Sequence, residues 1–153
     1  SGPVFKQGQV LSDAGGGLCL IATNLYQLFL HSGCTILERH NHSIDAYGEE
    51  RFYALGEDAA IAYTTKDLVI RNPFAQALLL KLTLRNRSIH SELIGVGSKP
   101  IQTIVQSVVL ERQPSSGSQK HPGWSVSTSR LTKKQTDRNW RQDYLSFSDY
   151  TPC

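Results

Sequence analysis

A glycine triplet followed by a leucine and a cysteine, Gly15-Gly16-Gly17-Leu18-Cys19, constrains this chain more than any other stretch. Directly after it, residues 18–31 carry apolar side chains on nearly every face, and most are good helix formers. Gly33 stands where a capping glycine would end a helix. We therefore expect one buried helix over residues 18–31, with Cys19 in its first turn.

The rest of the chain is predicted to consist mainly of strands. Residues 4–13 form a short extended approach with a turn at Gly8. A helix packed on a mainly antiparallel sheet is the simplest architecture that covers the apolar helix, so we predict an α+β fold. Short β-type runs separated by turn residues occupy 35–40, 59–64, 68–72, 77–85, 88–94 and 101–112, and runs at 124–130 and 141–147 predict a C-terminal β-hairpin with a polar tip at 132–139.

The length and composition indicate a single domain. A chain of 153 residues with 39% hydrophobic content suffices for one cooperative core and is too short for two ordinary domains. We expect one domain over residues 1–153, with a mobile loop at 113–123, where Pro, Ser and Gly are concentrated.

The charge pattern excludes one class of partner. The 16 Lys and Arg residues are spread along the chain and nearly matched by 13 acidic residues, which argues against nucleic-acid binding. No apolar run approaches the roughly 18 residues of a membrane span. We therefore expect membrane association only through segments absent from this chain. Because the sequence contains no methionine, we also expect a processed or shortened form of a longer protein.

The glycine triplet and the cysteine together suggest nucleophilic chemistry. A thiol near a helix N-terminus is stabilised as thiolate by unpaired backbone amides and the helix dipole. Glycines before it let the backbone approach a substrate carbonyl. With a histidine as base and a carboxylate to orient it, the set resembles a papain-like or NlpC/P60-like hydrolase or acyltransferase. The proposed roles are Cys19 as nucleophile, His42 or His40 as base, and Asp58, or with less support Asp67, as orienting group.

Structural explanations compete at each of these positions. Cysteine is among the most buried residue types, so Cys19 also fits simple packing. His40 and His42 alternate along a strand-like segment, which predicts that they share one face, where they could instead hydrogen-bond the backbone. Asp58 also fits a turn aspartate that bonds its own backbone.

A metal site and a binding module are the remaining alternatives. His40, His42 and Cys19 are all side chains that zinc accepts, but their spacing matches no zinc module. We therefore expect no cofactor and keep zinc as a weaker alternative. A non-catalytic module would instead stack sugar rings on aromatic side chains of the C-terminal half. These aromatic residues are Trp124, Trp140, Tyr144, Phe147 and Tyr150.

Three motifs occur in a familiar order between residues 15 and 72. GGGLC at 15–19 is followed by ERHNHS at 38–43 and by LGEDAAIAYTTKDLVIRN at 55–72. The set resembles the VanW family, in which GGG-[IL]-C-Q precedes a helix and ERH-x-HS and a G-x-DA block follow. Two differences stand out. Leu20 replaces the family glutamine, and the segment that family members carry before the GGG motif is nearly absent, so we expect a fragment or truncated member.

The resemblance implies a bacterial cell-envelope protein whose partner is a cell-wall peptide or glycan. The family name comes from glycopeptide-resistance gene clusters. Combined with the cysteine chemistry, it favours a hydrolase or acyltransferase that acts on peptidoglycan-type peptides, with a cell-wall-binding module as the alternative. The candidate ligand-binding residues are Gly15, Gly16, Gly17, Tyr26, Arg39, Ser43 and Trp140.

Overall fold

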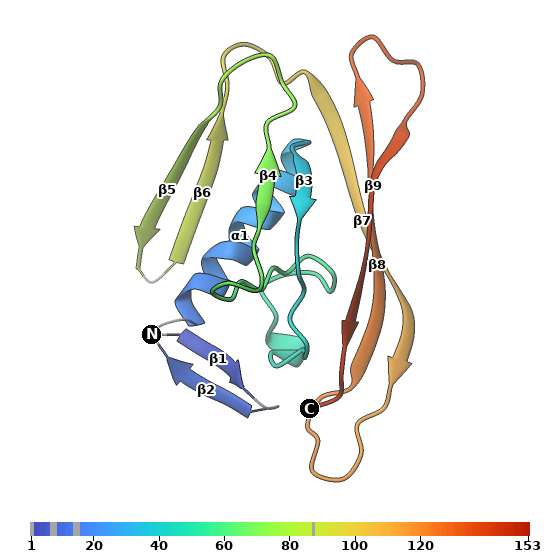
Figure 1. The fold of residues 1–153 in the computed structure, drawn as a ribbon. Coiled ribbons are helices and arrows are strands. Elements are labelled where there is room, and N and C mark those ends of the chain that lie inside the picture. The colour runs from blue at the N-terminus through green and yellow to red at the C-terminus, as the bar shows by residue number, and fades with distance from the viewer. Residues whose placement is uncertain (1, 7–8, 14–15, 87) are drawn as a thin grey trace.

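Helix α1 (Gly16–Ser32) lies at the centre of the molecule, between small β-hairpins and a larger twisted sheet (Figure 1). The arrangement is that of a computed structural model, which describes residues 2–6, 9–13, 16–86 and 88–153. Within these residues α1 contacts β1, β3, β6 and β7. None of the helices in these ranges is long and apolar enough to cross a bilayer.

In the part of the chain that the structure describes, the strands pair in four separate antiparallel sheets. Three of them are two-stranded, namely β1 with β2, β3 with β4 and β5 with β6, and the fourth has the order β7-β8-β9. The predicted α+β fold and its C-terminal hairpin, β8 with β9, are confirmed. The bounds are β1 Gly2–Lys6, β2 Gln9–Asp13, β3 Thr35–Glu38, the 3-10 turn η1 Gly48–Glu50, β4 Val69–Arg71, β5 Leu79–Arg85, β6 Ser88–Ile94, β7 Ile101–Gln113, β8 Gly123–Lys134 and β9 Arg141–Tyr150.

Both ends of α1 follow from its sequence. The helix begins at Gly16, two residues before the predicted start, so two of the glycines form part of its first turn. At the other end Gly33 adopts φ +90°, as predicted for a capping glycine. The amide of Gly33 donates to the Leu30 carbonyl at 3.4 Å and that of Cys34 to the Phe29 carbonyl at 3.1 Å. This pair of bonds is a Schellman motif, which ends the helix and turns the chain into β3.

One stripe of α1 forms the centre of the core. Ala22, Tyr26 and Leu30 are almost completely buried and pack with Ala59 from a distant loop. Their spacing of four residues keeps them on one helix face, and Cys19 continues that face toward the N-terminus. The core stripe therefore leads directly to the thiol.

Two predicted strands differ from the structure. Residues 59–64 form no strand, apart from an isolated bridge between Ala62 and Lys66. Their backbone bonds elsewhere, because the Ala60 amide donates to the His40 carbonyl at 2.8 Å. The strand predicted for 35–40 ends at Glu38 as β3, where its pairing with β4 becomes irregular.

The segment between β7 and β8, predicted as a mobile loop, contacts the C-terminal residues. The amides of Lys120 and His121 donate to the Cys153 carbonyl at 2.6 and 2.7 Å, and the Cys153 amide donates to the His121 carbonyl at 3.1 Å. These bonds hold the loop against the end of the chain. The predicted turn at Gly8 lies outside the described residues.

A cysteine, histidine and aspartate cluster beside the first turn of α1

Cys19, His42 and Asp58 meet beside the first turn of α1. Cys19 is half-buried in the helix, and its side chain hydrogen-bonds that of His42. The Cys19 Sγ also lies 3.6 Å from the Ile61 carbonyl oxygen. A helix, the segment after β3 and the loop before β4 thus each supply one member of the cluster.

The ring of His42 is fixed by Asp58. Its Nδ1 lies 2.6 Å from Asp58 Oδ2, and the His42 backbone amide donates to the same oxygen at 2.7 Å. A carboxylate can only accept, so Nδ1 carries the proton and Nε2 remains for Cys19. This is the tautomer that a histidine base requires.

Asp58 is completely buried and surrounded by donors. The Nη2 of Arg39 donates to Oδ1 at 2.8 Å, and the hydroxyl of Tyr150 donates to the same oxygen. Because both carboxylate oxygens are satisfied, the buried charge is compensated. Asp58 therefore contacts no solvent and acts on the cluster only through His42.

Arg39 joins the cluster to the β7-β8-β9 sheet. Its Nε donates to the Asp58 carbonyl at 2.7 Å, and its Nη1 donates to Ser148 Oγ of β9 at 2.7 Å. Its guanidinium lies 5.0 Å from the centre of the Tyr26 ring. The side chain is only 3% exposed, so Arg39 positions Asp58 and is not a surface group for binding a ligand.

The loop that carries Asp58 is hydrogen-bonded to α1, and at Gly56 near its start only a glycine fits. The Thr23 hydroxyl donates to the Ala59 carbonyl at 3.2 Å and accepts from the Ala59 amide at 3.0 Å. Thr23 lies one turn beyond Cys19, so this clip fixes the loop relative to the thiol. Gly56 has φ +88°, and a Cβ there would overlap Thr128 Oγ1.

The electrostatics favour a thiolate and imidazolium pair. The hydrogen bond with His42 lowers the pKa of Cys19, and this outweighs the opposing effect of burial. Burial alone would lower the pKa of His42, but the hydrogen bonds to Asp58 and Cys19 raise it to about 9. Burial would raise the pKa of Asp58, yet the hydrogen bond from His42 and the charge of Arg39 hold it below its usual range.

Sequence reasoning missed two residues near the thiol. The positive charge of Lys66 contributes to the lowered pKa of Cys19. The pKa of Tyr47 is raised by burial and further by the negative charge of Cys19. Tyr47 also packs edge-on against Phe52, whose side chain is half exposed. The cation that follows the turn at residues 63–65 and the Tyr47 side chain thus interact electrostatically with the thiol, and neither has a local sequence signal.

The second candidate base has a different partner. The Nε2 of His40 lies 2.9 Å from Glu38 Oε1, and both side chains are well exposed. The strand alternation on which a shared face of His40 and His42 was predicted does not apply, because β3 ends at Glu38, before both residues. Among the described residues no group of three or more His, Cys, Asp or Glu side chains is arranged to hold a metal ion.

The remaining predicted residues lie in three kinds of place. Gly16 and Gly17 form the first turn of α1, and a Cβ at Gly17 would meet no atom within 4 Å, whereas Gly15 lies outside the described residues. Tyr26 is fully buried, with its hydroxyl 3.1 Å from that of Tyr144, so it is a core residue and not a pocket lining. Ser43 is exposed, and its carbonyl accepts from the Thr151 amide at 2.8 Å.

The aromatic set considered for sugar binding is divided between core and surface. Tyr144 packs against the core, and Tyr150 is 2% exposed with its hydroxyl on Asp58. Trp140 and Phe147 are 38% and 63% exposed. Tyr150 is therefore part of the support for Asp58, a role that its distance of 92 residues along the chain conceals.

Comparison with known families places the chain. The profile described as VanW like protein matches residues 1–94, which carry the glycine triplet, Cys19, His42 and Asp58. This chain belongs to the VanW-like family. The predicted resemblance is confirmed, and all three members of the cluster lie within the matched family region.

Two relatives cover the same region. The chain is 29% identical over 95 residues to "Vancomycin B-type resistance protein VanW" of Enterococcus faecalis (strain ATCC 700802 / V583). The matched region covers 61% of this chain and 34% of that protein. The chain is 24% identical over 81 residues to "Uncharacterized protein YoaR" of Bacillus subtilis (strain 168), covering 53% and 25%. The matched region thus spans about a third or a quarter of these relatives. No solved structure matches the chain significantly.

Proposed function

We propose that this VanW-like chain carries a cysteine-dependent acyl-transfer site that acts on peptides of the bacterial cell envelope. The observation that carries the proposal is the chain of hydrogen bonds from Asp58 through His42 to Cys19. A nucleophile, a base and a group that orients the base are the parts that thiol acyl transfer needs. The envelope assignment is supported by membership of the VanW-like family and by the similarity to the Enterococcus protein, which is named for vancomycin resistance.

The geometry supports a two-step reaction. In the first step the Cys19 thiolate attacks a peptide carbonyl carbon, and the protonated ring of His42 gives its proton to the departing amine as the C–N bond breaks. The product is a thioester on Cys19. In the second step neutral His42 takes a proton from water or an acceptor amine, which attacks the thioester carbon. The C–S bond breaks, the acyl group passes to the water or amine, and Cys19 leaves as the thiolate beside protonated His42. Water gives hydrolysis, and an amine gives transpeptidation.

The first turn of α1 suits the developing oxyanion. The first amides of a helix have no partner within the helix and carry the positive end of its dipole. In α1 these include the amides of Gly16 and Gly17, close in sequence to the thiol. The open space beside Gly17 lets a carbonyl approach the backbone.

Trapping of the thioester tests the proposal. The chain is incubated with synthetic peptidoglycan stem peptides, and its intact mass is measured after acid quenching. We expect a mass increase equal to the acyl part of the peptide, located on Cys19 and removed by an added amine. The adduct should be absent in Cys19→Ala and present in Cys34→Ser. Peptide cleavage that persists in Cys19→Ala would refute it, and so would binding to purified cell wall without any adduct.

A further inference from the structure

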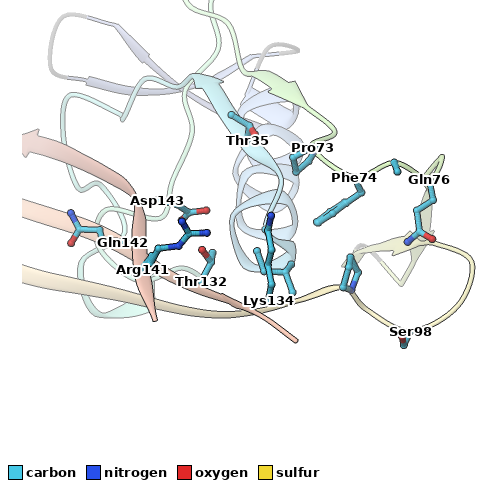
Figure 2. Close-up of a pocket in the computed structure, with 14 residues that line it drawn as sticks. Thr35, Pro73, Phe74, Gln76, Ser98, Thr132, Lys134, Arg141, Gln142 and Asp143 are labelled. Atoms are coloured by element: carbon cyan, nitrogen blue, oxygen red, sulfur yellow. The ribbon is translucent and has the colours of Figure 1, made fainter. Parts of the chain in front are cut away.

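A cavity of about 720 Å³ lies at the far end of α1 from the thiol (Figure 2). It is bordered by Gly33 and Thr35 after the helix, by Phe74 and Ile101, and by Arg141 to Asp143 of β9. Cys19 lies in the first turn of α1, so the 1.5 Å rise per residue puts the cavity about 20 Å from it along the helix. A volume of this size is typical of ligand pockets.

The segments that follow β3 and β9 meet at one isolated bridge, whereas the strands themselves lie apart on either side of this cavity. Ile44, downstream of β3, bridges Thr151 in parallel, and the Thr151 amide donates to the Ser43 carbonyl at 2.8 Å. Farther back along the two chains, Thr35 of β3 and Gln142 of β9 do not pair with each other and instead line the cavity. The cavity therefore lies between two strands, β3 and β9, that belong to different sheets and are not paired with each other.

Both borders of this gap are strand edges. In the described sheets β9 pairs only with β8, and β3 only with β4, so each has one unpaired edge. An unpaired edge presents backbone N–H and C=O groups that a further strand can bond. Peptides often bind proteins in this way, by adding a strand to an open edge.

The side chains that line the cavity favour a ligand that has both negative charge and an apolar group. Asp143 is already paired, because Arg130 donates to its two oxygens at 2.9 and 3.1 Å. Lys134 forms no ion pair within the described residues, and Arg141 reaches only Asp137, at 3.6 Å and largely exposed. In the view of Figure 2 the ammonium of Lys134 lies between Arg141 and Phe74. The available charge is positive and stands beside an apolar wall of Pro73, Phe74, Pro100 and Ile101.

We propose that the cavity between β3 and β9 binds an extended acidic peptide as an added strand. The peptide backbone hydrogen-bonds the unpaired edges of β3, at Thr35, and of β9. The acidic side chains of the peptide pair with Lys134 and Arg141, and an apolar side chain between them packs on Phe74. This inference does not depend on the chemistry of Cys19, since the cavity lies at the opposite end of the helix.

Fluorescence anisotropy with labelled peptides tests this site. The probe is Ala-Glu-Leu-Glu-Ala, and the controls are Ala-Lys-Leu-Lys-Ala, Ala-Glu-Ser-Glu-Ala and the first peptide with its central amides N-methylated. We expect saturable binding of the probe below about 1 mM and at least about tenfold weaker binding of each control. Equal binding of the N-methylated peptide would refute the added strand.

Variants separate the cavity from the general surface. Lys134→Glu with Arg141→Glu should reverse the preference toward the lysine peptide, and Phe74→Ala should weaken the probe by at least about tenfold. Lys133→Glu, next to Lys134 but not lining the cavity, is the matched control and should change binding by less than about threefold. The alkylation rate of Cys19 should stay unchanged in all of them, which verifies the fold. No saturable binding below about 1 mM, or binding indifferent to the double reversal, would overturn the proposal.

Discussion

One oxygen of Asp58 accepts both the backbone amide and the ring Nδ1 of His42, at 2.7 and 2.6 Å. These two hydrogen bonds hold the backbone and the ring of His42 to the same carboxylate oxygen. The ring can then rotate little, and its remaining nitrogen faces Cys19. The relationship explains why one of two histidines in the ERHNHS segment is assigned as the base.

The three cysteines should react at different rates with iodoacetamide at neutral pH. The pKa of Cys19 is lowered by His42, whereas burial raises that of Cys153, and Cys34 is only 1% exposed. Because the thiolate is the reacting form, Cys19 should be labelled first, by at least about tenfold. Peptide mapping of the labelled protein measures the order. Labelling of Cys153 as fast as Cys19 would contradict it.

Replacing Asp58 should lower the stability of the folded protein. Asp58→Asn leaves the buried Arg39 guanidinium without its counter-charge, so we expect a loss of about 3 kcal/mol in unfolding free energy. Asp67→Asn removes an exposed carboxylate that was the less supported candidate, and should change stability by less than about 0.5 kcal/mol. Urea unfolding of both variants compares them. Equal stability would show that Asp58 does not hold the cluster.

A methyl group at Gly56 should disrupt the loop that carries Asp58. Gly56 and Gly97 share positive φ angles of +88° and +84°, but only at Gly56 would a Cβ meet Thr128, whereas at Gly97 it meets nothing within 4 Å. We expect Gly97→Ala to cost about 1 kcal/mol and Gly56→Ala about 3 kcal/mol. Thermal unfolding reports both. Similar losses would mean that backbone strain alone limits this position.

The His42 and Asp58 pair should make stability depend on pH. The folded pKa of His42 is raised to about 9 from 6.5, so its contribution is complete below 6.5 and is lost as the pH rises through 9. Cys19 titrates with the opposite sign, so the measurement uses the Cys19→Ser background. In that background only Asp58 raises the pKa of His42, so the folded pKa lies below 9, and we expect the unfolding free energy to fall by about 1 to 2 kcal/mol as the pH rises from 6.5 to 9. Adding His42→Gln should abolish the fall, and adding His40→Gln should not. A fall that survives His42→Gln would assign it to another group.

Much of the fold was predictable because its signals are local. The Gly33 stop, the apolar stripe of α1 and the strands between residues 69 and 113 follow from periodicity and turn residues close in the sequence. The run at 59–64 failed because its backbone bonds Thr23 and His40 and not a neighbouring strand. Propensity cannot detect such tertiary bonds.

The candidate site was predictable only in part for the same reason. The Cys19, His42 and Asp58 positions stand out by residue type and motif, and the structure brings them together. The residues that hold Asp58 in place could not be predicted in this way, because Tyr150 lies 92 residues from Asp58 in the sequence and Arg39 is buried against a sheet formed far downstream. The cavity beside β3 and β9 likewise depends on two strands that meet only in the folded chain.

The most direct test of the central claim is the titration of Cys19 itself. In a Cys34→Ser and Cys153→Ser background, thiolate formation is followed by ultraviolet absorbance as the pH rises. We expect Cys19 to ionise clearly below its ordinary pKa of 9.0, to return to that value or above it in His42→Ala, and to stay low in His40→Ala. A pKa of 9.0 or higher with His42 intact, or a low pKa that survives its removal, would contradict the assignment of His42 as the partner of the thiol.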